Sequence, residues 1–170
     1  MTPPILATAR LRLRPRSLDD LDANLAMDLD PEVVRYVWGE PPEATAHRAE
    51  LAVRIASGWP DEGGIWAVEW KDRPGFLGWT GLFPLDGGEE IEIGYRFVRA
   101  AWGMGLATEA GSAVMAHGFE CRGLARIVAV ADPDNHASHR VLRKLGLQPC
   151  GRGWHYGREL CVFRKDRQRG

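Results

Sequence analysis

A change of sequence period at Gly64 constrains the fold of this chain more than any other feature. Upstream of it the pattern favours helices, whereas "IWAVEW", "FLGWTGLF" and "EIEIGYRFV" downstream follow the period of two that is typical of strands. The last two stretches are joined through "DGG", which indicates an antiparallel hairpin. We therefore expect three successive strands to follow a helical segment.

Helix signals stand on both sides of these strands. Ser17 and Asp20 fit a capping box, and Asp30 fits the cap of a second short helix. Downstream, one strand–helix–strand crossover is expected, so the order of elements describes an α/β domain. The expected elements are a strand at Ala9–Arg16, helices at 17–30, 30–38 and Ala44–Ser57, the three strands, a helix at about Leu106–Phe119, a strand at Ala125–Ala131, a helix at about Asn135–Leu145 and a hairpin at 153–165.

Charge and cysteine content exclude several classes of protein. The formal net charge is −1, so no overall field attracts nucleic acid or a membrane surface, and no apolar stretch has the length of a signal peptide or a membrane span. Cys121, Cys150 and Cys161 lack metal-ligand spacing and leave one cysteine unpaired in any disulfide scheme, which favours a reducing cytoplasm. We expect a cytoplasmic monomer or homodimer whose basic end, about 165–170, frays.

A glycine turn links the third of the three strands to the next helix in "FVRAAWGMGLATEA". Gly103 and Gly105 allow a tight turn and close approach of a ligand, and the first turn of a helix offers unpaired amides to an anion. A phosphate cradle and a plain strand-to-helix turn are both open interpretations. Nucleotide-binding motifs fit poorly, because no Lys follows and Thr108 stands where a third glycine is required.

Two motifs carry a resemblance to a known family. "GYRFVRAAWGMGLATEA" and "DNHASHRVLRKLGL" occur in that order, about 30 residues apart. Together with the element order they resemble the GNAT superfamily of acetyl-CoA-dependent N-acetyltransferases, in particular its RimJ/RimL-type branch. The resemblance implies one mixed α/β (α+β) domain over residues 1–170, with a central mixed, mostly antiparallel twisted sheet and helices on both faces.

The resemblance also assigns residues to acetyl-CoA. Backbone amides of the glycine turn would bind the pyrophosphate, and the preceding strand would pair with the pantetheine arm like an added strand. Asn135 would hold that arm by its side chain, or serve only as a helix cap. The family's usual Gln or Arg before the turn is replaced by Ala100. The residues assigned to acetyl-CoA are Phe97, Val98, Arg99, Trp102, Gly103, Met104, Gly105, Leu106, Ala107, Thr108 and Asn135.

Two residues are expected to assist proton transfer, because the amine must lose a proton and the departing thiolate benefits from one. Strand alternation places Glu90 and Glu92 on one charged face, and we expect Glu92 to be the base, acting through water; a solvated strand face is the alternative. The family's usual acid, a Tyr, is Leu142 here. The RimJ/RimL-type pattern instead implies Ser138, which otherwise is a helix-start Ser. The opposite face of the strand carries Ile91, Ile93, Tyr95 and Phe97.

The acceptor side is less constrained. By resemblance, the early helices form a lid at about Tyr36–Pro42, with Trp38 directed at the substrate; Trp66 and Trp79 line the same cleft or pack in the core. Acidic groups and aromatic rings would suit a cationic amine, through charge and cation–π contact. The residues assigned to the acceptor, a small molecule or a peptide N-terminus, are Tyr36, Trp38, Trp79 and Glu90.

Two groups of residues, both containing histidines, lie outside these assignments. His136 and His139 lack a third ligand at suitable spacing, so no metal is expected. His155 and Tyr156 are interpreted as turn-exposed side chains, with contact to the acceptor as the alternative. The expected activity is direct acetyl transfer to a primary amine in a ternary complex. A non-catalytic CoA-binding module is the alternative, because the Ala100 and Leu142 positions depart from the family.

Overall fold

The computed structural model describes residues 2–58 and 64–168, which contain eight strands and five α-helices. The strands are β1 (Leu6–Ala7), β2 (Leu11–Pro15), β3 (Gly64–Trp70), β4 (Arg73–Pro84), β5 (Ile91–Phe97), β6 (Arg126–Ala131), β7 (Gln148–His155) and β8 (Arg158–Asp166). The helices are α1 (Leu21–Asp28), α2 (Pro31–Val34), α3 (Ala44–Ser57), α4 (Leu106–Ala116) and α5 (His136–Lys144). Apart from the two-residue β1, which is too short to show a period, every strand and helix has its expected counterpart.

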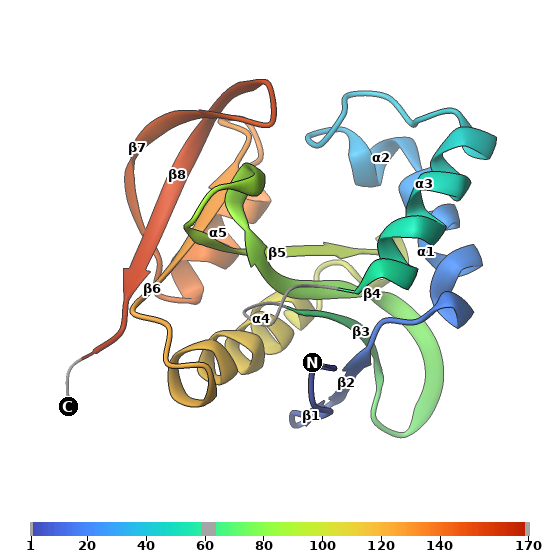
Figure 1. Cartoon of the computed structure of the whole chain (residues 1–170), viewed down its shortest axis with the longest axis horizontal. Helices are drawn as coiled ribbons and strands as arrows, with labels where there is room; N and C mark the ends of the chain where they lie inside the picture. Colours follow the sequence, from blue (N-terminus) through green and yellow to red (C-terminus); the bar gives the residue numbers. More distant parts are fainter. Residues whose placement is uncertain (1, 59–63, 169–170) are drawn as a thin grey trace.

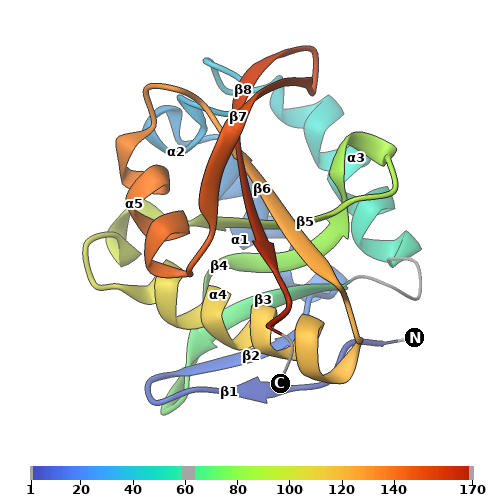
Figure 2. The same ribbon diagram turned by 90° about the vertical axis from the view of Figure 1, so that its left-hand side faces the viewer.

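The strands of the described chain form one open sheet in the order β1-β2-β3-β4-β5-β6-β8-β7 (Figure 1). Every neighbouring pair is antiparallel except β5 and β6. Figure 2 shows α4 on one face of the sheet, with α1, α2 and α3 behind it. The predicted fold class, a mixed and mostly antiparallel sheet with helices on both faces, is confirmed.

Local capping explains where the early helices begin. The Asp20 carboxylate accepts from the Ser17 amide at 2.9 Å while the Ser17 hydroxyl accepts from the Asp19 amide, which confirms the capping box. Asp30 accepts from the Glu32 amide at the start of α2, and Glu43 caps α3 in the same way. These caps fix the helices that cover the cavity described below.

The apolar side of α4 packs on the central strands and builds the core. Buried residues of this helix lie against fully buried leucines of β2 and against β4 and β5. The helix ends at Ala116, earlier than expected, and continues as one π-helical turn at His117–Cys121. Gly118 lies so close to the sheet that a Cβ would stand 2.9 Å from Leu82 Cδ1.

The C-terminal strand is longer than the sequence indicated. Lys165 and Asp166 were expected to fray, but both belong to β8, which pairs with β6 up to Asp166 opposite Arg126. The Arg167 amide also donates to the Ala125 carbonyl at 2.8 Å. The expectation is therefore wrong up to this point, and residues 169–170 lie outside the described residues. Within the described ranges, every helix is too short or too polar to cross a bilayer.

The parallel pair β5 and β6 meets at one register position, Glu92 opposite Val128. Beyond this point the two strands diverge, as Figure 2 shows. The part of β5 that follows Glu92 therefore has no strand partner on the β6 side among the described residues. This divergence opens the sheet and positions the site.

Candidate active site

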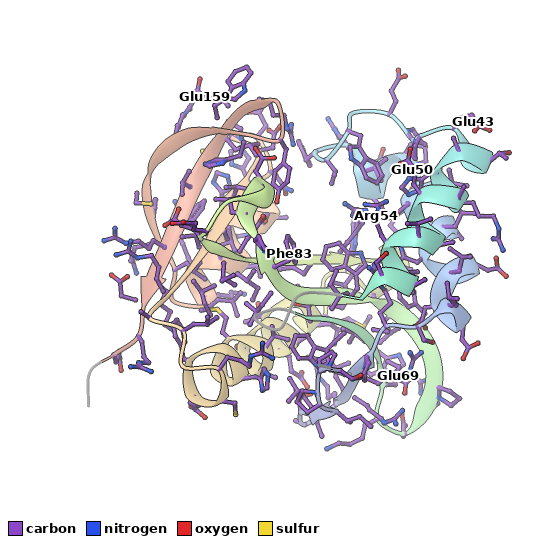
Figure 3. All side chains as sticks on the ribbon, viewed as in Figure 1. Glu43, Glu50, Arg54, Glu69, Phe83 and Glu159 are labelled. Carbon is purple, nitrogen blue, oxygen red and sulfur yellow. The ribbon has the colours of Figure 1, made fainter. Side chains whose placement is uncertain are left out.

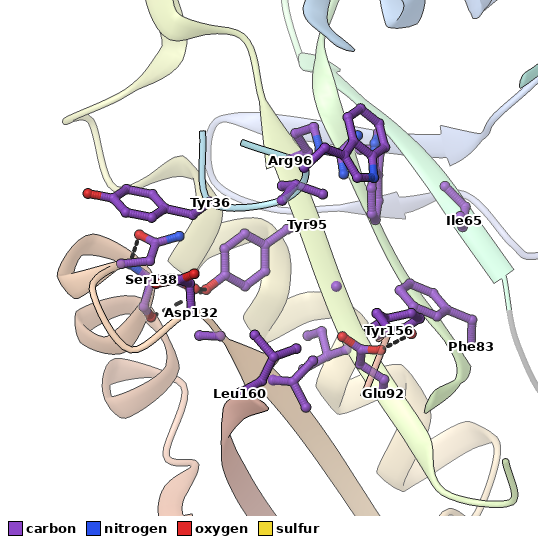
Figure 4. Close-up of a pocket in the computed structure, with 18 of the residues that line it drawn as sticks. Tyr36, Ile65, Phe83, Glu92, Tyr95, Arg96, Asp132, Ser138, Tyr156 and Leu160 are labelled. Atoms are coloured by element: carbon purple, nitrogen blue, oxygen red, sulfur yellow. Dashed lines mark hydrogen bonds between the residues drawn. The ribbon is translucent and has the colours of Figure 1, made fainter. Parts of the chain in front are cut away.

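A cavity of about 640 Å³ opens where β5 and β6 diverge (Figure 4). Its walls come from α1, α3, β4, β5, β6, α5 and the β7–β8 turn, which are distant in sequence. Figure 3 shows Arg54 of α3 and Phe83 of β4 on opposite sides of this space. The volume lies in the range usual for small-molecule sites.

Glu92 lies at the vertex of the two strands and is 6% exposed. The Tyr156 hydroxyl donates a hydrogen bond of 2.6 Å to Glu92 Oε2. Burial raises the pKa of Glu92 to about 7, although the bond from Tyr156 opposes the shift. A carboxyl with that pKa can gain and lose a proton near neutral pH, as a general base must.

Tyr156 is held over Glu92 by an interlock of two turns. Asp86, in the β4–β5 turn, and Tyr156, in the β7–β8 turn, both have left-handed backbones, with φ of 47° and 53°. Asp86 Oδ2 accepts from the Tyr156 amide at 2.9 Å, and the Asp86 amide donates to the Tyr156 hydroxyl at 3.1 Å. Tyr156 is exposed in its turn, as interpreted from the sequence, but its hydroxyl also reaches Glu92 and the side chain lines the cavity.

The opposite wall carries neutral polar groups, which we call the hydroxyl end: Tyr95, Asn135 and Ser138. The Tyr95 hydroxyl and Ser138 Oγ share a hydrogen bond of 2.8 Å, and burial raises the pKa of Tyr95 to about 12. Asn135 Oδ1 accepts from the Ser138 amide at 3.2 Å, so Asn135 does cap α5. Strand alternation assigned Tyr95 to the face opposite Glu92. Both nevertheless line one cavity, because β6 turns away and leaves that edge of β5 open.

The third wall, which we call the arginine end, consists of Arg16, Arg54 and Arg96. The Arg96 guanidinium lies 4.7 Å from the ring centroid of Trp38 and 5.5 Å from that of Trp79. It also donates to Asp28 Oδ1 at 2.6 Å. Trp38 and Trp79 therefore line the cavity as expected, but an arginine of the protein itself occupies the cation–π position that was expected for the substrate.

For three further residues predicted near the acceptor, the structure shows whether each lines the cavity. Tyr36 lines the cavity, and its carbonyl accepts from Arg158. Trp66 does not line it: the ring is buried in the core and its Nε1 donates to the Pro4 carbonyl at 2.7 Å. Glu90 is also outside: it precedes β5, and its carboxylate lies 3.9 Å from the Arg126 guanidinium in a separate pocket. We therefore leave Glu90 out of the site.

The glycine turn adopts the conformation that its sequence indicated. Gly103 and Gly105 have φ of 74° and 75°, which residues with a Cβ rarely adopt, and a Cβ on Gly103 would meet nothing within 4 Å. Gly105 caps α4 without a side-chain hydrogen bond to the first helical amides. Open space, unpaired amides and the helix dipole together fit a bound phosphate. Trp102 and Met104 on this turn are both substantially exposed.

The stretch Phe97–Arg99 differs from expectation. Only Phe97 belongs to β5, and a 3₁₀ turn begins at Arg99. The Val98 amide donates to the Leu77 carbonyl at 2.9 Å, and the Arg99 guanidinium pairs with Asp30 at 2.7 Å. Val98 and Arg99 have therefore left the open edge, which consists of the β5 residues that follow Glu92.

Comparison with known proteins identifies the family. A family model described as an acetyltransferase (GNAT) domain matches residues 10–148. The chain belongs to the GNAT acetyltransferases. YoaA of Bacillus subtilis (strain 168), an uncharacterized N-acetyltransferase, is 36% identical over 150 residues, which cover 87% of this chain and 85% of YoaA.

Solved GNAT structures agree in fold. An acetyltransferase from Agrobacterium tumefaciens str. C58 has a TM-score of 0.82 at 24% identity, covering 97% of this chain and 95% of that one. RimL, a ribosomal L7/L12 alpha-N-protein acetyltransferase in complex with coenzyme A, has a TM-score of 0.75 at 16% identity, covering 96% and 98%. This GNAT chain is thus an acetyl-CoA-dependent enzyme. Among its described residues, no group of three or more His, Cys, Asp or Glu could hold a metal ion.

Proposed function

We propose that the protein transfers the acetyl group of acetyl-CoA to a primary amine by direct attack in a ternary complex. The observation that carries this proposal is the position of Glu92, which lines the cavity where β5 and β6 meet, is buried, and has a pKa raised to about 7. In the described chain, this is the only carboxyl group lining the cavity that has no arginine partner.

Acetyl-CoA would be held by backbone more than by side chains. The amides of residues 103–108 would bind its pyrophosphate, whereas the Trp102 amide, included in the sequence-based assignment, already donates to the Arg99 carbonyl at 3.1 Å. The open edge of β5 after Glu92 would pair with the pantetheine arm. Asn135 uses its side-chain oxygen to cap α5, so its amide nitrogen would contact the arm. When bound, acetyl-CoA supplies the acetyl group as a reactive thioester.

Glu92 would accept the proton that the amine loses, through one water molecule. Tyr156 donates to Oε2 and thereby directs the carboxylate, while the second oxygen of Glu92 remains for the water. A pKa near the working pH lets the group cycle between its two forms without a large energetic cost.

Ser138 would donate a hydrogen bond to the departing thiolate. A Ser hydroxyl is a weak acid, but the Tyr95 hydroxyl lies 2.8 Å away and can donate to it in turn. Tyr95 thus places a phenol beside Ser138, although Leu142 occupies the position of the family's usual Tyr. The pair would stabilise negative charge on the sulfur as it develops.

The test is release of free thiol from acetyl-CoA with a panel of primary amines, together with a binding isotherm for CoA. Turnover with at least one amine supports the proposal. Tight CoA binding with no turnover by any amine would instead identify a non-catalytic CoA-binding module of the same fold.

A further inference from the structure

The arginine end carries positive charge that ion pairs within the described chain do not fully neutralise. Arg96 pairs with Asp28 at 2.6 Å, and the cavity's fourth arginine, Arg158, pairs with Asp132 at 2.7 Å. For Arg16 and Arg54, which also line the cavity, no carboxylate of the described chain lies within 4.0 Å. Two guanidinium groups that line the cavity therefore have no ion-pair partner among residues 2–58 and 64–168.

Arg16 is fixed in place by a neutral group. Its Nη1 donates to Asn24 Oδ1 at 3.1 Å, and its charge lies in a partly desolvated position. Burial and the charge of nearby Arg54 lower the pKa of Arg16 to about 10, so the surroundings disfavour its charge. A guanidinium in that setting gains from any anion that enters.

The nearest carboxylates cannot supply that anion, because each already has several donors. Asp28 accepts from Arg96, from His47 Nε2 at 2.8 Å and from Asn24 Nδ2 at 3.2 Å. Asp20 accepts from Arg14 through both oxygens, at 2.7 and 2.9 Å. The counter-ion of Arg16 and Arg54 must therefore come from outside these residues.

The phosphates of CoA are expected elsewhere. The glycine turn begins α4 on one face of the sheet, whereas Arg54 belongs to α3 on the other face (Figures 2 and 3). Ser138, the proposed contact of the CoA thiolate, lies on α5, and Figure 4 shows it on a different side of the cavity from Arg96 of the arginine end. The anion that approaches Arg16 and Arg54 is thus best placed on the acceptor.

We propose that Arg16 and Arg54 bind a carboxylate of the acceptor, so that the substrate class is an amine that carries a carboxylate, such as an amino acid. This inference rests on the proposed function. It narrows the expected cationic amine to one that also carries a carboxylate, because four arginines in the cavity would repel a polycation. The same positive charge favours the neutral, nucleophilic form of the acceptor's amine over the ammonium form.

Matched acceptor pairs test the inference. A panel of amino acids is offered as free acids and as the corresponding amides, with thiol release from acetyl-CoA giving kcat/KM for each. Because a carboxylate can accept charge-assisted hydrogen bonds from both guanidinium groups and a neutral amide cannot, we expect roughly tenfold or greater preference for the acid. Equal kcat/KM for acid and amide across the panel overturns the inference while leaving the proposed function intact.

Variants connect the preference to the arginines. Arg54→Gln, on an exposed helix position, should reduce the acid-to-amide ratio several-fold without changing CoA affinity, and Arg16→Gln should do the same if it folds. The matched control is Arg73→Gln, which removes an exposed arginine outside the cavity and should leave the ratio unchanged. An unchanged ratio in Arg54→Gln overturns the assignment.

Binding measurements distinguish failure of the proposed function from failure of the carboxylate inference. If CoA binds but no amine is turned over, the proposed function fails, and calorimetry of acid and amide with the CoA-saturated protein still tests the anion preference. Tighter binding of the acid that is lost in Arg54→Gln supports the inference. Equal binding, or binding of neither member of any pair, overturns it.

Discussion

The two ends of the cavity differ in charge, and we expect them to act at different steps of the reaction. The hydroxyl end is neutral and hydrogen-bonded, with Tyr95, Asn135 and Ser138 linked in one chain, whereas the arginine end carries fixed charge on Arg16, Arg54 and Arg96. Neutral hydroxyls gain most when charge develops beside them during the reaction, while fixed guanidiniums attract an anion before it starts. The hydroxyl end should therefore govern kcat and the arginine end KM of the acceptor.

The largest effect on kcat should come from substitution of Glu92, which lies between the two ends. Glu92→Gln keeps the shape of the side chain but removes the proposed base, so kcat should fall by roughly 10²- to 10⁴-fold. The affinity for acetyl-CoA and the KM of the acceptor should change little, because neither end of the cavity loses a group. Steady-state kinetics and calorimetry check both statements, and a kcat within a few-fold of wild type removes Glu92 from the mechanism.

The same variant has an effect on stability that depends on pH. The folded pKa of Glu92, about 7, exceeds its ordinary value of 4.5, so the folded state binds more protons than the unfolded state between these values. Wild type should therefore lose stability relative to Glu92→Gln as pH rises from 4.5 to 7, by at most about 3 kcal/mol. Urea unfolding across this range measures the difference, and parallel curves contradict it.

Arg96→Gln should produce the next largest effect, at the arginine end. It leaves Asp28, which is 2% exposed, without its closest cationic partner. Removing one partner of a buried pair should lower the free energy of unfolding by about 3 kcal/mol, and the loss of the Trp38–Arg96–Trp79 stack should raise the KM of the acceptor. Arg126→Gln is the control, because its partner Asp166 is exposed and little change is expected. Equal losses in both variants contradict the assigned role.

Ser138→Ala should lower kcat by roughly tenfold, since it removes one hydrogen bond to the developing thiolate. The affinity for acetyl-CoA and the KM of the acceptor should remain near the wild-type values. Tyr95→Phe keeps Ser138 but removes its partner, so a smaller decrease in kcat is expected. A wild-type kcat for Ser138→Ala removes this residue from the scheme, and a raised acceptor KM contradicts the division between the two ends.

Tyr156→Phe should have the smallest effect. The Tyr156 hydroxyl lowers the pKa of Glu92, so its loss raises that pKa further above its ordinary value. Glu92 would then become ionised only at higher pH, and the acidic limb of the kcat/KM profile should move upward. At neutral pH we expect less than about a tenfold loss, largely recovered in alkaline buffer. A profile that is lowered uniformly at every pH would instead indicate that Tyr156 acts by position alone.

Features encoded within one short stretch could be predicted from the sequence. The left-handed Gly103 and Gly105 and the start of α4 follow from local glycine and helix signals. Ser138 and Asn135 lie in one helix-start motif, and the structure places both at the cavity. The α/β class followed from the change of period and the order of elements, whereas the mixed, mostly antiparallel sheet was implied by the resemblance to the GNAT superfamily.

Features that depend on tertiary packing could not be predicted. Tyr156 and Glu92 are 64 positions apart, and only the two interlocked turns bring them together. Arg16 and Arg54 meet because α3 covers the sheet, and nothing in either local sequence indicates that. The place of Tyr95 in the cavity could not be predicted for another reason. Strand alternation puts it on the face opposite Glu92, and both line one cavity because β5 and β6 pair at one position only.

The left-handed backbones of Asp86 and Tyr156 lower the stability of the fold, but the proposed function needs the Tyr156 side chain at Glu92. A residue with a Cβ in the left-handed backbone region costs about 1 kcal/mol or more in stability. In each turn the next residue, Gly87 or Gly157, also has a positive φ and is a glycine. Selection for heat resistance alone would therefore favour glycine at position 156. Such a variant would lose the hydroxyl bound to Glu92. A thermostabilised form of this enzyme should be screened for turnover first at these two turns.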